Sequence, residues 1–490
     1  MFKKNLFTRF LVAVLLIGLI VANGLTSFDG NKLFKSIEAE AAENAPKYVF
    51  YFIGDGLGAA QRQIAEYYKQ EVTGDKNAKL LMNTLPVAGI NTTYSADTLV
   101  TDSAAAGTAL ATGHKTNNGM ISQKPDGTSV KSLIELAEEK GMATGIVTTT
   151  RLTHATPAVF AAHNASRNNE NDIAVEFLES GVDYFAGGGN RHFVPQNWKW
   201  GKSKRTDDRN LLTEFNNKGY TVFASKDDSA AFRKYEPKMG DKVIATLAYS
   251  HLPYEIDRKQ TDESPSLGEI TQKGIELLSK ADKGFFLMVE GGRIDHACHA
   301  NDAVGSIHDT LAFDDAIAKA YEFYQKHPEE TLIVVVGDHE TGGMGLGFGK
   351  NYFVKVDGLK DVKASVEDVL IDKYDGDKEA YFKYIAENFG LNDLTEEEKA
   401  KIIKAMDIKD SKKEDYDLVT YGPNYYCPVA VTTTHIISER TNIQWTTYAH
   451  SATSIPMSAI GKGAENFGGY KDNTEIAKAM ANLMGFELTK

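Results

Sequence analysis

Cysteine is nearly absent from this chain of 490 residues, which contains only Cys298 and Cys427. Two cysteines cannot build the disulfide framework of a small secreted scaffold, and the sequence does not say whether these two pair. Proline is also scarce, with 12 residues, whereas 42% of all residues are apolar. We therefore expect a chain that buries a large core, as one domain with insertions or as two domains, and that is not disordered.

Positive charge is in short supply. The chain has 54 Lys and Arg against 67 Asp and Glu, which gives a formal net charge of −13. The phosphate backbone of a nucleic acid favours a basic protein face, so no nucleic-acid binding is expected. An anionic small-molecule substrate would need a local concentration of positive charge.

Long apolar runs are limited to the N-terminus, where residues 11–22 follow three basic residues and precede the triplet Ala39-Glu40-Ala41, whose first and last residues are small. This pattern predicts a secretory signal peptide over residues 1–41, and hence a secreted, periplasmic or cell-surface protein. Because the gap between the run and the triplet is long, an uncleaved membrane anchor is the alternative. Residues 1–41 hold five Lys/Arg and three Asp/Glu, so the chain without them has a formal net charge of −15.

Acidic residues follow short apolar runs of strand length at three places. Asp55 follows residues 48–53, Glu290 follows residues 285–289, and Asp338 with His339 follows residues 331–336. Each run is rich in β-branched or aromatic residues and stops at glycine or an acid, which is typical of a buried strand. The three glycines around Asp55 do not form a dinucleotide-binding loop, because the third comes two positions after the second instead of three.

Asp295 and His299 are four residues apart in a segment where apolar residues recur at helical spacing from Ala297 to Leu311. A helix from Ile294 onward would place both side chains on one face. One carboxylate and one imidazole can together hold a zinc-like ion. For this pair alone, a solvated helix start is the alternative.

Small side chains crowd residues 100–113, and Asp102 or Ser103 can begin a helix there. The first turn of a helix binds phosphate through free backbone N–H groups and the helix dipole. Ser103 is therefore a candidate nucleophile that attacks phosphorus, with a simple N-cap as the alternative.

A fourth predicted strand, residues 143–149, leads to His154, Thr156 and Arg167. The Thr156 hydroxyl suits a hard cation such as magnesium, and the Arg167 guanidinium suits two phosphate oxygens. An exposed Arg with no function is the alternative for Arg167.

Strands that end in functional side chains and alternate with helix-length segments predict an α/β fold, with a central, mostly parallel sheet flanked by helices. Charged helical sequence in residues 345–440, which includes a capping box from Thr395 to Glu398, predicts an inserted surface subdomain. The catalytic domain would then comprise residues 42–344 and 441–490. The last part carries His450 and a final amphipathic helix over residues 473–484.

Histidines cluster in or beside these motifs, and together with the acids they supply enough ligands for two zinc-like sites and a harder third site. This arrangement suits metal-assisted phosphoryl transfer. The five histidines are His154, His296, His299, His339 and His450.

Taken in chain order, from Asp55 and Ser103 to His339 and His450, the motifs resemble those of the alkaline phosphatase family. The resemblance implies a phosphoserine intermediate on Ser103, phosphate binding by Arg167, and a homodimer. It also implies His154 and His296 at two positions beside the bound phosphate, where some family members carry Asp and Lys. The implied metal ligands are Asp295, His299 and His450 for one zinc, Asp55, Asp338 and His339 for a second zinc, and Asp55, Thr156 and Glu290 for magnesium.

The expected function is that of an exported phosphate-monoester hydrolase that works at alkaline pH and releases inorganic phosphate. The sequence argues against a sulfatase of similar fold, because Ser103 is followed by three alanines and a glycine instead of the Pro and Arg that such an enzyme requires. Two alternatives remain: a phosphodiesterase of the same superfamily, and a non-catalytic, exported metal-binding surface protein.

Overall fold

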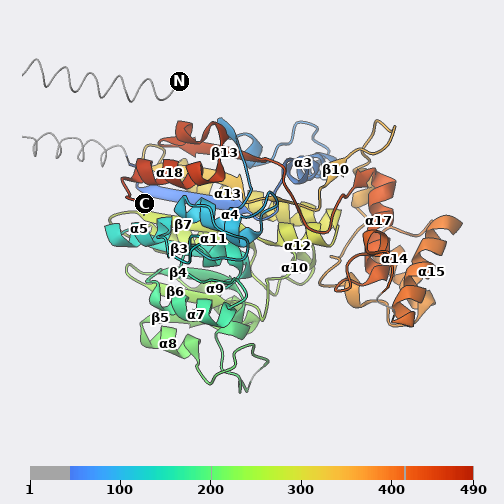
Figure 1. Cartoon of the computed structure of the whole chain (residues 1–490), viewed down its shortest axis with the longest axis horizontal. Helices are drawn as coiled ribbons and strands as arrows, with labels where there is room; N and C mark the ends of the chain where they lie inside the picture. Colours follow the sequence, from blue (N-terminus) through green and yellow to red (C-terminus); the bar gives the residue numbers. More distant parts are fainter. Residues whose placement is uncertain (1–44, 200, 413–414, 489–490) are drawn as a thin grey trace, which may run out of the picture. The chain divides into compact units, whose positions relative to one another are not determined.

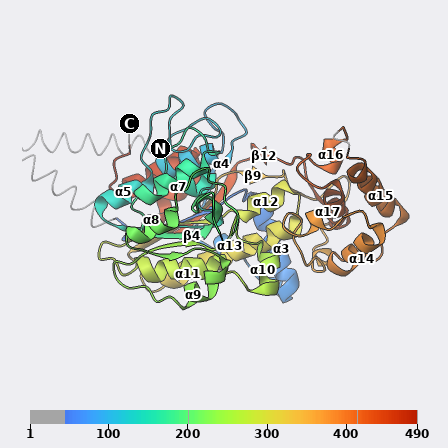
Figure 2. The same ribbon diagram turned by 90° about the horizontal axis from the view of Figure 1, so that it is seen from below.

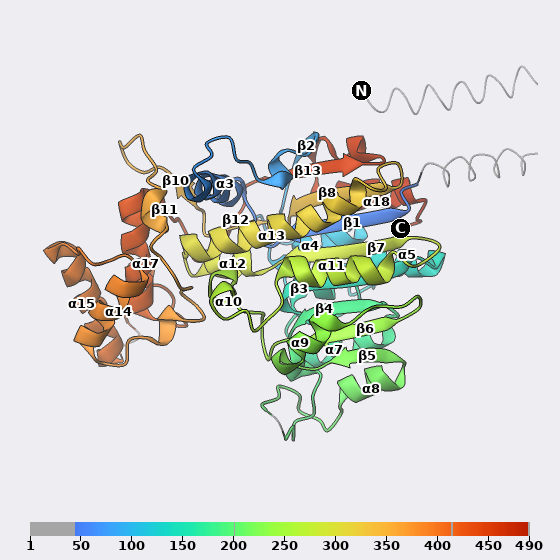
Figure 3. The ribbon, with the colours of Figure 1, turned by 180° about the vertical axis from the view of Figure 1, so that it is seen from behind.

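The four strands that carry the functional side chains lie side by side at the centre of one sheet (Figures 1 and 3). They are β8 (Thr331–Gly337), β1 (Tyr48–Gly54), β7 (Phe285–Gly291) and β3 (Ala143–Arg151), in that spatial order. All three pairings among them are parallel, and β1, β7 and β8 are buried along their whole length. Near-continuous apolar sequence is expected of parallel strands that are covered on both faces.

The computed structural model describes residues 45–199, 201–412 and 415–488, and the chain forms one compact unit from Pro46 onward. The predicted signal peptide, residues 1–41, lies outside the described residues. Within the described part of the chain, no helix is both long and apolar enough to span a bilayer. Cys298 and Cys427 are both buried, and neither takes part in a disulfide there.

The described residues form a ten-stranded sheet in the order β14-β2-β13-β8-β1-β7-β3-β4-β6-β5. Only β13 runs antiparallel to its neighbours, β2 and β8. The predicted fold class, an α/β fold with a mostly parallel sheet, is therefore confirmed. The outer strands are β2 (Val87–Asn91), β4 (Tyr184–Gly188), β5 (Tyr220–Phe223), β6 (Lys242–Thr246), β13 (Ile455–Gly461) and β14 (Gly469–Lys471).

Helices cover both faces of the sheet, and successive residues of β1 point into different cores. Phe50 and Phe52 lie in one apolar cluster, whereas Tyr51 and Ile53 lie in the other. The first face is covered by α3 (Ala59–Thr73), α9 (Ser229–Lys234), α10 (Glu255–Thr261), α11 (Leu267–Leu278) and α13 (Ala303–Tyr324) (Figure 3). The second is covered by α4 (Ser103–Thr112), α5 (Leu133–Lys140), α6 (Ala155–Ala158), α7 (Glu170–Glu179), α8 (Leu211–Asn217) and α18 (Asn473–Met484), the last as predicted.

The predicted helix that carries Asp295 and His299 is interrupted. α12 spans only Arg293–His299, and α13 begins at Ala303. Asn301 has a positive φ of 51°, and the Asp302 carboxylate caps α13 by accepting a bond from the Gly305 N–H. The prediction of one continuous helix was wrong, because apolar residues keep a helical period across the break and hide it.

Residues 345–440 lie largely outside the sheet (Figures 1 and 2). Tyr381 and Ile402 there are buried in the same apolar cluster as Phe50, so this segment packs continuously onto one side of the molecule. The capping box between Thr395 and Glu398 is confirmed, whereas the boundaries at 345 and 440 stay a prediction. The helices are α14 (Lys378–Asn388), α15 (Glu396–Ser411), α16 (Leu418–Tyr421) and α17 (Pro428–Thr441). Two small ladders flank the segment: β10 (Gly345–Leu346) with β11 (Ile443–Gln444), and β9 (Glu340–Thr341) with β12 (His450–Ser451).

Candidate active site

The carboxyl ends of the central strands bring the predicted acids to one edge of the sheet. Ile53 is in register with Glu290, and Gly54 is in register with Gly337, so Asp55 and Asp338 follow two paired positions. Parallel strands all end at the same edge, which is where α/β proteins bind their ligands. The structure places all the predicted metal ligands in three adjoining groups.

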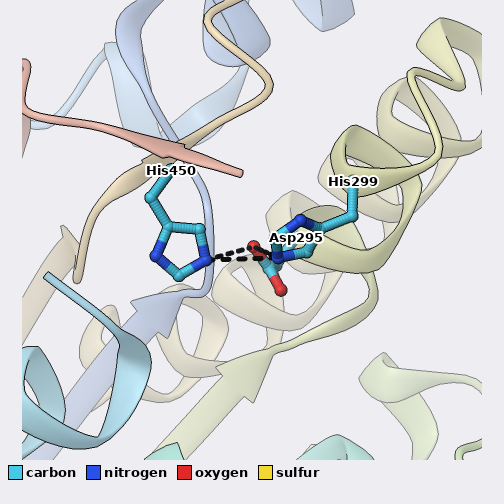
Figure 4. Close-up of side chains that lie close together, drawn as sticks. All are labelled: Asp295, His299 and His450. Carbon is cyan, nitrogen blue, oxygen red and sulfur yellow. Dashed lines mark hydrogen bonds and ion pairs between the residues drawn. The ribbon is translucent and has the colours of Figure 1, made fainter. Parts of the chain in front are cut away.

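The first group contains Asp295, His299 and His450, which converge from α12 and β12 (Figure 4). Asp295 Oδ1 lies 3.3 Å from His299 Nε2 and 3.5 Å from His450 Nε2, and the two Nε2 atoms are 3.2 Å apart. Burial opposes a charge on His299, yet the neighbouring Asp295 carboxylate raises the pKa of His299 to about 9. The group therefore attracts positive charge.

Backbone carbonyls orient both imidazoles of this group. His299 Nδ1 donates to the Tyr448 carbonyl and His450 Nδ1 to the Thr101 carbonyl, each at 2.7 Å. A carbonyl only accepts, so each Nδ1 carries a hydrogen, and in the neutral rings both Nε2 lone pairs face Asp295. Bonds of this kind fix the rings of metal-binding histidines.

The second group contains Asp55, Asp338 and His339, all completely buried. His339 Nε2 lies 3.3 Å from a carboxylate oxygen of each acid and 3.2 Å from the Ser103 hydroxyl. Within the described chain, Asp55 Oδ1 and Asp338 Oδ2 have no hydrogen-bond partner. Burial and charge repulsion from neighbouring acids raise the pKa of both carboxyls well above the usual range.

The third group contains Asp55, Glu290 and His154, with the Thr156 hydroxyl donating to Asp55 at 3.4 Å. One oxygen of Glu290 accepts bonds from Thr148 and from Thr150, whereas the other is buried without a partner among the described residues. Burial raises the pKa of Glu290 to about 7. The three predicted magnesium ligands thus lie together, and His154 joins them.

Arg167 is held in place by Asp102 and His154. Its Nη1 donates to Asp102 Oδ2 and its Nη2 to His154 Nε2, both at 3.0 Å. These contacts use two of the five N–H donors of the guanidinium and leave three for other partners. Asp102 also caps α4, so one side chain both stabilises the first turn of the helix that begins at Ser103 and orients Arg167.

His296 lies beside His154, with ring centroids 5.5 Å apart, and beside His251, at 4.3 Å. Its Nδ1 accepts a hydrogen bond from Arg293 Nη1 at 3.1 Å, because a guanidinium only donates. Burial lowers the pKa of His296 to about 4 and lowers the pKa values of His154 and His251 as well. The three rings are therefore uncharged at neutral and alkaline pH.

This geometry agrees with the match to a known family. The family model described as alkaline phosphatase matches residues 46–486. The chain belongs to the alkaline phosphatase family. Alkaline phosphatase 3 of Bacillus subtilis (strain 168) is 34% identical over 454 residues, which cover 90% of each chain.

Solved alkaline phosphatases share the fold. The Thermus thermophilus enzyme has a TM-score of 0.77 at 31% identity, with 91% of this chain and 94% of that chain covered. A variant of the alkaline phosphatase of the Antarctic bacterium TAB5, solved with Mg bound in the M3 site, has a TM-score of 0.62 at 28% identity, with 91% and 99% covered. The protein is therefore a phosphatase, of a family that depends on metal ions.

The three groups fit the metal dependence of alkaline phosphatases. Four acids are buried around one edge of the sheet, and three of their oxygens have no hydrogen-bond partner in the described chain. Buried carboxylates are costly unless they are paired with positive charge or bind a cation. The acids are Asp55, Glu290, Asp295 and Asp338.

Sequence reasoning missed several residues that support this alkaline phosphatase site. Asp102 could have been recognised as a partner of Arg167 only from the fold, although its capping role was expected. Thr148 stands at a predicted strand end, which was a usable signal. Thr341, which donates to Asp295, and His251, which contacts His296, carry no local sequence signal because their partners are distant in the chain.

Proposed function

We propose that this alkaline phosphatase is an exported phosphate-monoester hydrolase that forms a phosphoserine on Ser103 and releases inorganic phosphate at alkaline pH. The observation that carries the proposal is the position of Ser103. It is the first residue of α4, it is almost fully buried, and its hydroxyl lies 3.2 Å from His339 Nε2. A serine hydroxyl is a weak nucleophile until a neighbouring group activates it.

The proposed cofactors are two zinc ions and one magnesium ion. Asp295, His299 and His450 would hold one zinc, since two imidazoles and a carboxylate suit that ion. When bound, the cations supply Lewis-acid charge beside the reacting oxygens. The ligands of the second zinc would be Asp55, Asp338 and His339, and those of magnesium Asp55, Thr156 and Glu290.

The TAB5 variant with Mg in its M3 site supports magnesium in a member of this family. In the present chain the acids Asp55 and Glu290, with the Thr156 hydroxyl, offer the oxygen ligands that magnesium prefers. His154 lies with them and also accepts a bond from Arg167, so it links the proposed magnesium ligands to the phosphate-binding side chain.

The protein's own residues position the phosphate for in-line transfer. Arg167 donates to two non-bridging oxygens, and the free N–H groups at the start of α4 favour the anion. As the bond from Ser103 Oγ to phosphorus forms, the hydroxyl gives up its proton and the bond from phosphorus to the ester oxygen breaks. The departing oxygen takes up a proton, and the product leaves as the alcohol. Water then replaces Ser103 on phosphorus, which restores the hydroxyl and releases inorganic phosphate.

The first prediction tests Ser103. Ser103→Ala should lower kcat for an aryl phosphate by a factor of about 10³ or more, because the nucleophile is lost. Its zinc and magnesium content, measured by mass spectrometry, should stay that of the unchanged protein. Ser454→Ala, which alters an exposed serine, is the matched control. Recovery of a phosphopeptide without Ser103 from an acid-quenched reaction would contradict the mechanism.

The two alternatives give different results in one assay. A phosphodiesterase would hydrolyse an aryl diester faster than the corresponding monoester, and a non-catalytic metal-binding protein would release phosphate from neither. Export through residues 1–41 stays a prediction that N-terminal sequencing of protein recovered outside the cytoplasm would test. The homodimer also stays a prediction, and sedimentation of the purified protein would test it.

A further inference from the structure

A groove of about 360 Å³ adjoins the side of the site that carries His299 and His450. Pockets for small molecules commonly measure about 300–1,000 Å³. One wall comes from the segment between α15 and α17, and the other from the loop before β12. The side chains that dominate it are Leu418, Val419, Tyr425, His435, Trp445 and Tyr448.

The groove shares a wall with the first metal-binding group. The carbonyl of Tyr448 accepts the bond from His299 Nδ1, and Ala449 in the groove wall precedes His450 directly. Asn301, also in the wall, lies two residues after His299 and accepts a bond from His435. The backbone that orients His299 and leads directly into His450 therefore also forms the groove.

A series of short contacts leads from the nucleophile toward this groove. Ser103 Oγ lies 3.2 Å from His339, the rings of His339 and His450 stack with centroids 3.6 Å apart, and His450 lies 3.2 Å from His299. In an in-line displacement, the leaving oxygen lies opposite the attacking oxygen. The alcohol should therefore leave on the side of the site that carries His299 and His450, which the groove adjoins.

The groove is uncharged. Among the described residues that line it, none is Asp, Glu, Lys or Arg, and burial lowers the pKa of His435 to about 4, so that ring is neutral. A neutral, aromatic surface beside a site for a dianion suits the organic part of a substrate and not its phosphate. Val419 and Tyr425 are 81% and 69% exposed, which leaves large apolar surface for a ligand to cover.

The remaining aromatic walls are fixed in place. The Trp445 indole donates to Ser438 Oγ at 3.1 Å, and the Tyr448 hydroxyl donates to the Val419 carbonyl at 3.0 Å. The Tyr448 ring also stacks on His435, with centroids 6.0 Å apart. Walls held in this way lose little conformational freedom when a ring binds between them.

We propose that this groove binds the organic group of the phosphate monoester and favours aryl or other planar apolar alcohols over small polar ones. The inference rests on the proposed function, since it assumes that the phosphate is held at Ser103 and Arg167. It adds a substrate preference to that function and assigns the preference to Val419, Tyr425, Trp445 and Tyr448.

Two variants of exposed residues test the groove without disturbing the core. Tyr425→Ala and Val419→Ser should each lower kcat/KM for 2-naphthyl phosphate by a factor of about 3–20, the range expected for losing apolar contacts with a bound group. The same variants should change kcat/KM for glycerol 2-phosphate by less than about twofold. Tyr470→Ala is the matched control, because Tyr470 is 70% exposed on β14, outside the groove. An equal change for both substrates in the groove variants would overturn the proposal.

A binding measurement separates failure of the groove from failure of the proposed function. Calorimetry would compare naphthylmethyl phosphonate with methyl phosphonate, neither of which can be hydrolysed at its phosphorus–carbon bond. Tighter binding of the naphthyl compound, lost in Tyr425→Ala but kept in Tyr470→Ala, would support the groove even if neither phosphate ester were hydrolysed. Equal affinities for the two phosphonates in the unchanged protein would overturn the groove while leaving the hydrolase activity in place.

Discussion

Arg167 is the side chain that we propose binds the phosphate of the substrate. Arg167→Ala should lower kcat/KM for a phosphate monoester by a factor of about 10²–10³, because charge-assisted bonds to two oxygens are lost. The loss for a diester should be much smaller, because a diester carries one negative charge fewer and its oxygens accept weaker charge-assisted bonds from Arg167. The measurement is kcat/KM for an aryl monoester and the matching diester.

Asp102 provides a related variant for that experiment. Asp102→Asn keeps an oxygen that can cap α4 but weakens the charged contact with Arg167. It should therefore show a smaller monoester loss than Arg167→Ala. Equal losses for monoester and diester in Arg167→Ala would show that Arg167 does not contact the phosphate.

His296 should control how tightly the product is held. Burial lowers its pKa to about 4, so the ring is neutral at the working pH, whereas Lys would add a positive charge there. His296→Lys should lower the inhibition constant of inorganic phosphate by roughly tenfold and slow turnover where product release limits the rate. Inhibition by phosphate at alkaline pH is the measurement.

The control for this variant is His327→Lys, which makes the same substitution at a half-exposed position beyond the end of α13. It should leave the phosphate inhibition constant unchanged. If His296→Lys also leaves the constant unchanged, His296 does not face the bound phosphate.

At the start of α15, the Glu398 side chain both completes the helix cap and pairs with the neighbouring helix α17. Glu398 accepts a bond from the Thr395 N–H at 2.8 Å to complete the capping box, and it also accepts two bonds of 2.7 Å from Arg440 on α17. Glu398→Ala should reduce the free energy of unfolding by about 1–2 kcal/mol, because it removes a cap and a bidentate, partly exposed ion pair. Urea unfolding would measure the loss.

Glu398 should also make the free energy of unfolding depend on pH. Hydrogen bonds from Arg440 lower the pKa of Glu398 to about 2, from an ordinary value of 4.5. Its contribution to stability is thus fully present above about pH 4.5 and is lost as the pH falls toward 2. The stability difference between the unchanged protein and Glu398→Ala should shrink over that range. Glu396→Ala, in the first turn of the same helix, should change the free energy of unfolding by less than about 0.5 kcal/mol, and an equal effect of the two variants would contradict this role.

The strands and helix caps were the parts of the fold that local sequence predicted well. The run from Thr331 to Val336 forms β8, and Thr395 caps α15, because strand composition and capping depend on residues that are adjacent in the chain. The break at Asn301 was missed because no glycine or proline marks it in the local sequence. His251 and Thr341 were missed because their roles depend on contacts formed only after folding.

For the whole molecule, bound cations should contribute to stability. The carboxylates gathered at the edge of the sheet repel one another when no cation is present, and ligands that bind only the folded state stabilise it. Chelation should therefore lower Tm by on the order of 5 °C or more, and zinc with magnesium should restore Tm and activity. Calorimetry before and after chelation is the measurement.

A change at Glu290 should have opposite effects on Tm of the chelated protein and on Tm of the protein supplied with cations. Glu290→Gln removes one negative charge, so it should raise Tm of the chelated protein and lower Tm and activity of the protein supplied with cations. A Tm that does not respond to chelation in the unchanged protein would show that the buried acids do not hold cations.

The pairing of β1 has a consequence for the order in which the chain folds. β1 lies near the start of the described chain, yet Tyr48 pairs only with Phe285 on one side and Thr331 on the other. During synthesis, this apolar strand therefore has no partner strand until β7 has been made, about three fifths of the way along the chain. Contacts between residues so distant in sequence form slowly, and unpaired apolar strands are prone to aggregation. Assembly of the catalytic edge is thus a late event. The yield of folded enzyme should therefore depend on how well the nascent chain is protected from aggregation until Gly337 has been made.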